Sequence, residues 1–219
     1  MTVRRALIPF ATALALVVTA LAVILGGAAK PLELLDPGPL VRWGVPLART
    51  VHDLAAALTV GSLLLGGLLV PEAKTTARRQ TAGRIAAWSA LVWALAGFVR
   101  AIFAYGDAAG VSVGSPGFWS GAWKFTWELE VLRAPAITAV AAAVISAWCF
   151  LRPRRNGLAW AFFASLVALW PLALSGHAAG SSDHETGVDS LAVHLLLVTV
   201  WVGGIAAIAI MWDLSLIHI

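Results

Sequence analysis

The sequence predicts an all-α protein: a bundle of about six helices that crosses a membrane several times. Three observations lead to this fold class. Of the 219 residues, 60% are hydrophobic and only 12% are charged, and the mean hydropathy is +0.88. An ordinary soluble domain is about one quarter charged, so too few polar side chains are present to cover a water-facing surface. The apolar residues come in long runs, whereas membrane strands would alternate polar and apolar residues.

Six apolar stretches are long enough to cross a bilayer, which takes about 20 residues of helix. They cover residues 6–29, 47–70, 85–105, 134–151, 158–176 and 190–212. The first run is longer than the roughly 7–15 apolar residues of a cleaved signal peptide, and this predicts a retained helix. Four prolines in the first connection predict a turn-rich loop over residues 30–46 rather than a helix; they are Pro31, Pro37, Pro39 and Pro46.

Basic residues mark alternate connections and therefore one side of the membrane. They precede the first stretch, separate the second from the third, and separate the fourth from the fifth; they are Arg4, Arg5, Lys74, Arg78, Arg79, Arg84, Arg152, Arg154 and Arg155. Basic loops stay in the cytoplasm, so the N-terminus is predicted to be cytoplasmic. The formal charge of +4 belongs to these loops, and we expect no nucleic-acid partner.

A tryptophan pattern stands out in the connection between the third and fourth stretches. Trp119, Trp123 and Trp127 are four residues apart, so on a helix they form one stripe. The spacing predicts an interfacial helix that lies in the headgroup region. A ligand-facing aromatic wall is the alternative interpretation.

Four histidines are predicted to lie near the outer face. His52 opens the second span, His177 closes the fifth, His184 lies in the connection between the fifth and sixth, and His194 lies about 6 Å beyond the start of the sixth. Such a one-sided group indicates an outward-facing metal site. An intramembrane histidine that only hydrogen-bonds a neighbouring helix is the alternative for each of them. Asp53 either orients the His52 imidazole or caps the start of the helix.

The connection over residues 175–189 is the most polar part of the chain. It contains two histidines and three carboxylates and no lysine or arginine, a composition that attracts cations. Asp183 and His184 are therefore candidate ligands, with a solvated loop as the alternative. On the sixth span, Gly203 and Gly204 permit the close approach of another helix.

The chemistry of the available ligands does not choose the metal. The single cysteine, Cys149, and the methionines Met1 and Met211 are all predicted to lie toward the inner side, which leaves imidazole and carboxylate. Imidazole suits copper, zinc, iron and nickel. The sequence shows no phosphate-binding glycine loop, no His-Glu-x-x-His pattern and no Gly-x-Ser-x-Gly elbow. We therefore do not expect an enzyme.

Particular residues resemble those of the copper resistance protein D (CopD) family. They are Leu-Ser-Gly-His-Ala at 174–178, the acidic connection that follows, His194, and Trp-Val-Gly-Gly at 201–204. The segment 51–61 resembles the N-terminal part of actinobacterial members, in which a cytochrome c oxidase assembly (CtaG-like) domain often follows. The resemblance makes residues 1–213 a CopD-like transmembrane domain. Residues 214–219 read like a translated sequencing adapter, so we expect a non-native tail and a natural chain that continues past Asp213.

The resemblance implies a multi-pass protein of the bacterial plasma (inner) membrane that binds copper at an outward-facing site and imports it, in copper homeostasis or resistance. His177 and His194 match the histidine positions of the family, and His52 matches more loosely. The partners it implies are the copper ion, the lipid bilayer, and an extracytoplasmic copper chaperone or a cytochrome oxidase subunit.

Two other functions fit the same residues. Paired histidines on facing helices of a bundle can hold haem, so a haem-b electron-transfer protein is one alternative. The other is a factor that delivers copper for cytochrome oxidase assembly and transports nothing.

Overall fold

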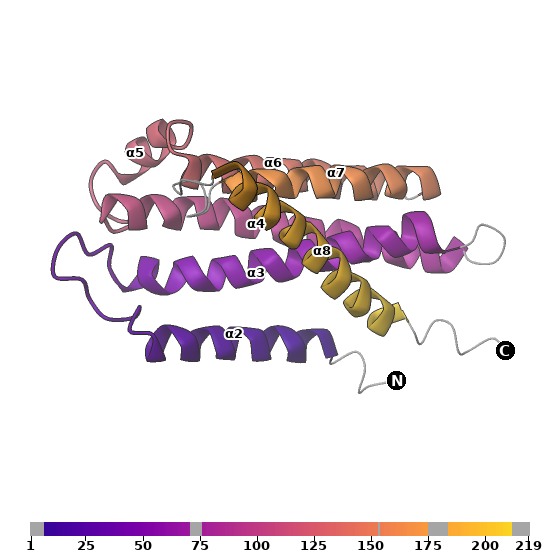
Figure 1. The fold of residues 1–219 in the computed structure, drawn as a ribbon, viewed down its shortest axis with the longest axis horizontal. Coiled ribbons are helices and arrows are strands. Elements are labelled where there is room, and N and C mark those ends of the chain that lie inside the picture. Colours follow the sequence, from indigo (N-terminus) through magenta and orange to yellow (C-terminus); the bar gives the residue numbers. More distant parts are fainter. Residues whose placement is uncertain (1–6, 71–75, 153, 175–183, 212–219) are drawn as a thin grey trace.

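The computed structural model describes residues 7–70, 76–152, 154–174 and 184–211 (Figure 1). In chain order its helices are α2 (Leu7–Leu25), α3 (Pro39–Leu64), the π-helix η1 (Leu65–Leu69), α4 (Thr76–Ala109), α5 (Phe118–Phe125), α6 (Glu130–Leu151), α7 (Arg155–Leu174) and α8 (His184–Met211). The described ranges contain helices and connections but no strand, so the predicted all-α class is confirmed.

Four of the described helical stretches are long and apolar enough to cross a membrane. They are Pro39–Leu69, Ala77–Ala109, Glu130–Leu151 and Ser190–Met211, and they correspond to the second, third, fourth and sixth predicted spans. The first predicted span is a shorter apolar helix, Pro9–Leu25, and the fifth corresponds to α7. The protein is therefore a multi-pass membrane protein. The cytoplasmic side of the N-terminus stays a prediction.

The core of the bundle lies where α3, α4, α6 and α7 pack side by side (Figure 1). More than half of its residues are alanines, among them Ala56, Ala87, Ala90 and Ala142, and these small side chains let the helices approach closely. Trp93 on α4 is the largest fully buried side chain among the described residues. Outside this core, large apolar side chains such as Trp88 on α4 and Leu197 and Trp201 on α8 are exposed, as expected of faces that contact lipid.

α8 crosses α3 obliquely (Figure 1), and glycines mark the crossing point. A methyl group on Gly61 would overlap the carbonyl group of Gly203, and a methyl group on Gly203 would overlap the carbonyl oxygen of Ala57. The predicted close approach at Gly203 is therefore confirmed. The backbone nitrogen of Gly204 also lies against Gly61, but a Cβ atom on Gly204 itself would meet only Leu64 Cδ2, at 3.9 Å, so the contact requires a glycine at 203 and not at 204.

The predicted loop over residues 30–46 is wrong in its second half, because α3 begins at Pro39 and contains Pro46. Pro39 fits the first helical position, where no N–H bond is lost. A proline inside a helix costs about 3 kcal/mol, but Val41 and Ala48 on either side of Pro46 are buried against the bundle. Packing of the apolar face thus outweighs the local preference of the prolines.

An ion pair closes the loop that precedes α3. The Arg42 guanidinium bonds the carboxylate of Asp36, which also accepts the backbone N–H of Gly38 at 3.1 Å. Arg42 Nε donates to the Ala29 carbonyl at 3.2 Å. The hydrogen bond from Arg42 is the main reason why the pKa of Asp36 lies below its usual value. The loop is thus fixed to the first turn of the helix it leads into.

The predicted tryptophan-bearing helix is present as α5, which ends at Phe125. Trp119 and Trp123 are exposed on it, and Trp127 is exposed just beyond its end. The helix is held by Phe118, which is buried against Tyr105 with ring centroids 5.1 Å apart. The three tryptophans are therefore free to contact a membrane interface, as the sequence predicts.

Candidate functional site

His52 lies in the middle of α3 and does not open a helix as predicted. Thirteen residues of helix precede it from Pro39, or about 20 Å at a rise of about 1.5 Å per residue. The prediction was wrong because it placed the helix start after the last proline of the loop. The alternative role of Asp53 as a helix cap is excluded by the same finding.

The His52 imidazole is completely buried, and both of its nitrogens are hydrogen-bonded. Nε2 lies 2.9 Å from Nε1 of Trp93 on α4, and Nδ1 lies 2.8 Å from Oδ1 of Asp53. An indole N–H can only donate, so His52 Nε2 is the acceptor and carries no proton. The proton therefore sits on Nδ1, which donates to Asp53. His52 is a neutral imidazole in one defined tautomer.

Asp53 thus has the orienting role that the sequence suggested as one alternative. A carboxylate that accepts Nδ1–H leaves the Nε2 lone pair pointing away, which is the arrangement seen behind metal-ligating histidines. Here that lone pair faces Trp93. The two rings meet edge to face, with centroids 6.1 Å apart and planes at 77°.

Two guanidinium groups act on the Asp53 carboxylate, which is the exposed member of the His52–Asp53 pair. Arg49 Nε lies 3.7 Å from Asp53 Oδ2, and Arg100 of α4 acts electrostatically on both Asp53 and His52. Two positive charges therefore accompany one carboxylate. On the other side, both the His52 and the Trp93 rings are fully buried, and their bond is the hydrogen bond to a neighbouring helix that the sequence suggested as the alternative role of this histidine.

His194 is exposed on α8, whereas His52 is buried in the bundle on α3. Each histidine precedes its crossing glycine by nine residues, His52 before Gly61 and His194 before Gly203. Nine residues are two and a half helical turns, so each side chain faces away from the other helix. The two imidazoles therefore do not meet across the contact between these helices.

The remaining predicted ligands come from the connection between α7 and α8. His177 and Asp183 lie outside the described residues. His184 is the first residue of α8, so the helix begins six residues before the predicted start of the sixth span. The solvated loop that was the alternative to ligation therefore does not extend past this residue. Among the described residues, no three histidine, cysteine or carboxylate side chains gather as a metal site.

Trp93 is the site residue that the sequence did not indicate. It lies inside an apolar run, 41 residues from His52, with no motif around it. Tryptophan is expected at membrane interfaces, whereas Trp93 stands in the middle of the apolar run over residues 85–105. That position is the signal that could have drawn attention to it. A tryptophan buried inside a span needs an acceptor for its N–H, and a histidine on another span can supply one.

The fold and this site define a class of protein: an all-helical, multi-pass membrane protein that buries an oriented imidazole between two of its helices. A family model described as copper resistance protein D-like, N-terminal domain, matches residues 35–188. Because the match covers most of the chain, the protein belongs to this copper-resistance family, as the resemblance predicted. His52, His177, Asp183 and His184 lie within the matched range, and His194 lies beyond it. No curated protein and no solved structure matches the chain.

Proposed function

We propose that the protein binds copper through histidines that face the outer side of the bacterial plasma membrane and moves the ion inward. Its membership of the copper-resistance family supports a role with copper. The observation that carries the site is His52, a buried, neutral imidazole with its Nδ1–H held by a carboxylate. Imidazole nitrogen is a suitable copper ligand.

Copper would bind at Nε2 of His52 by replacing the hydrogen bond from Trp93. The exchange leaves Asp53 bonded to Nδ1–H, so the ring keeps its orientation while its lone pair changes partner. His177 and His194 are the proposed outer ligands that capture the ion. Since His52 is buried within the bundle, His194 is exposed, and each faces away from the helix that carries the other, we assign them to separate binding steps.

The first test is copper content and an absorption spectrum of the purified full chain, with His52→Gln and His177→Ala/His194→Ala beside it. We expect near-stoichiometric copper in the wild type, a loss in either variant, and no Soret band. Cys149→Ser is the matched control, since this thiol is buried elsewhere in the bundle and should leave copper unchanged. Copper retained by both histidine variants would refute the site.

A second measurement separates import from delivery. Reconstituted vesicles loaded with a copper indicator should report uptake by the wild type and none by the histidine variants. Bound copper without uptake would refute import and support a delivery factor for oxidase assembly. A Soret band that the histidine variants abolish would move the assignment to haem b.

A further inference from the structure

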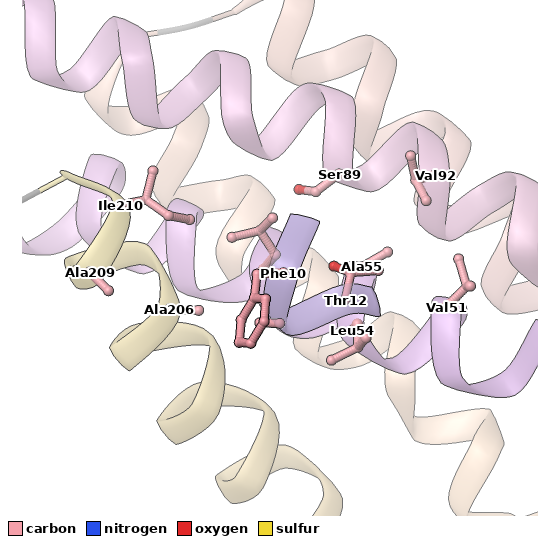
Figure 2. Close-up of a pocket in the computed structure, with 12 residues that line it drawn as sticks. Phe10, Thr12, Val51, Leu54, Ala55, Ser89, Val92, Ala206, Ala209 and Ile210 are labelled. Carbon is pink, nitrogen blue, oxygen red and sulfur yellow. The ribbon is translucent and has the colours of Figure 1, made fainter. Parts of the chain in front are cut away.

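An apolar groove runs along the bundle between α2 and α4, and none of its described lining residues is a histidine. Its central cavity, of about 490 Å³, lies between α2, α3, α4 and α8 (Figure 2). It shares Val51 and Val92 with a cavity toward one end of α4, and Leu58, Ser89 and Val92 with a cavity toward the other. The three cavities therefore form one continuous groove.

The length of the groove matches the thickness of a bilayer. Its lining residues on α4 extend from Thr81 to Phe103, which is about 33 Å of helix beside a hydrocarbon core of about 30 Å. Phe10 and Val92 line it and are exposed. The groove is thus open to the lipid along its side.

The lining of the groove needs no polar occupant. Figure 2 shows the hydroxyl-bearing residues Ser89 and Thr12 among lining side chains that are otherwise apolar, and the hydroxyl group of Ser89 is already bonded. Ser89 Oγ accepts from Thr59 Oγ1 and donates to the Ile85 carbonyl, both at 2.8 Å. A water molecule would find too few hydrogen-bond partners in such a space, so a hydrocarbon is the suitable occupant.

One end of the groove carries a positive charge with no anionic neighbour. Arg84 lines that end together with Thr81 and Trp88, and it is exposed. Within the described parts of the chain, the ion pairs join other residues and leave Arg84 without a carboxylate. A guanidinium fork matches the oxygens of a phosphate group, and an exposed tryptophan suits the headgroup level.

We propose that this groove is a binding site for one anionic phospholipid, with the acyl chain along α3 and α4 and the headgroup phosphate on Arg84. The charge at one end and the uninterrupted apolar path from it distinguish the site from ordinary lipid-facing surface. The lipid fills the space that separates α2 and α8 from α4. The inference does not depend on copper binding.

Native mass spectrometry of the full chain tests the proposal, with phosphatidylglycerol and phosphatidylcholine added separately to delipidated protein. We expect one retained phosphatidylglycerol per chain and weaker binding of phosphatidylcholine. Arg84→Gln should lower the affinity for phosphatidylglycerol about tenfold, because a charged hydrogen bond is lost. Ala209→Phe, which fills the central cavity from α8, should abolish retention. Arg152→Gln removes the same charge at the end of α6, away from the groove, and should change nothing.

Three results would overturn the proposal. Equal loss of lipid in Arg84→Gln and Arg152→Gln would show that general charge, not this site, holds the lipid. Equal binding of the two phospholipids by the wild type would exclude headgroup recognition. A lipid-free dimer of the wild type that Ala209→Phe converts to monomer would assign the groove to a second copy of the chain.

Discussion

Gly203→Ala should push α8 away from α3 and destabilise the bundle, whereas Gly204→Ala should not. The methyl group at position 203 would come closer than 3.0 Å to the Ala57 carbonyl oxygen, a distance that real Cβ atoms essentially never show. Both obstacles, Ala57 and Gly61, are backbone atoms of α3, so no rotamer can relieve the clash. The helices must separate by about 1 Å, which forfeits up to about half of the dispersion energy of each contact.

The comparison with Gly204 isolates this effect. Each substitution adds one methyl group to the same helix at adjacent positions. The gain in helix propensity and the loss of conformational entropy in the unfolded chain are therefore the same for both variants and cancel in the comparison. At Gly204 the methyl group meets only Leu64, at 3.9 Å. The difference in free energy of unfolding between the variants is therefore the cost of overpacking, about 1–3 kcal/mol. For a chain of this size, about 2 kcal/mol lowers Tm by about 4–8 °C.

Thermal unfolding of the two variants in the same detergent measures the difference. Gly61→Ala should repeat the loss of Gly203→Ala, since the two glycines face each other, and the double variant should lose less than the sum. If Gly203→Ala were as stable as Gly204→Ala, the close crossing of α3 and α8 would be refuted.

Three further predictions concern other contacts. Trp93→Phe removes the N–H that competes for His52 Nε2, so copper should bind about fivefold more tightly, the equivalent of one hydrogen bond; unchanged or weaker binding in a copper titration would contradict this. Asp36→Asn should lower Tm at neutral pH, and the difference from wild type should vanish as pH falls below 3.8 through the lower folded pKa of Asp36; a difference that persists in acid would exclude the ion pair as its cause. Gly121→Ala should displace α5, because the methyl group would overlap the Tyr105 hydroxyl, and Tyr105→Phe should restore part of the protease resistance; no rescue would point to another cause.

Most of the architecture could be predicted from the sequence because hydropathy acts along the whole length of a span. A run of about 20 apolar residues has few alternatives to a membrane helix. The helix boundaries were predicted less accurately, since they depend on a few local residues. Pro39 and Pro46 suggested a loop, but burial of Val41 and Ala48 extended the helix through both prolines.

The candidate site was harder to predict, because hydropathy places a residue along the membrane normal but not around the helix axis. Even the level of His52 was misjudged, because the predicted span began later than α3 does and so put this residue near its start, whereas it lies in the middle of the helix. The directions of His52 and His194 depend on the packing of α3 and α8, which the sequence does not show. Trp93 became a partner of His52 only once α4 was placed beside α3.

The bonds through His52 all run in one direction, from Trp93 to His52 to Asp53, and this polarity couples residues that never touch. If the carboxylate of Asp53 were lost, the imidazole proton could move to Nε2, where it would face the indole N–H of Trp93 donor to donor. The indole would then have to leave its buried place or remain unbonded, which costs about 1–3 kcal/mol. Loss of the Asp53 carboxylate, on the exposed side of α3, would thus change the packing of a buried side chain on α4.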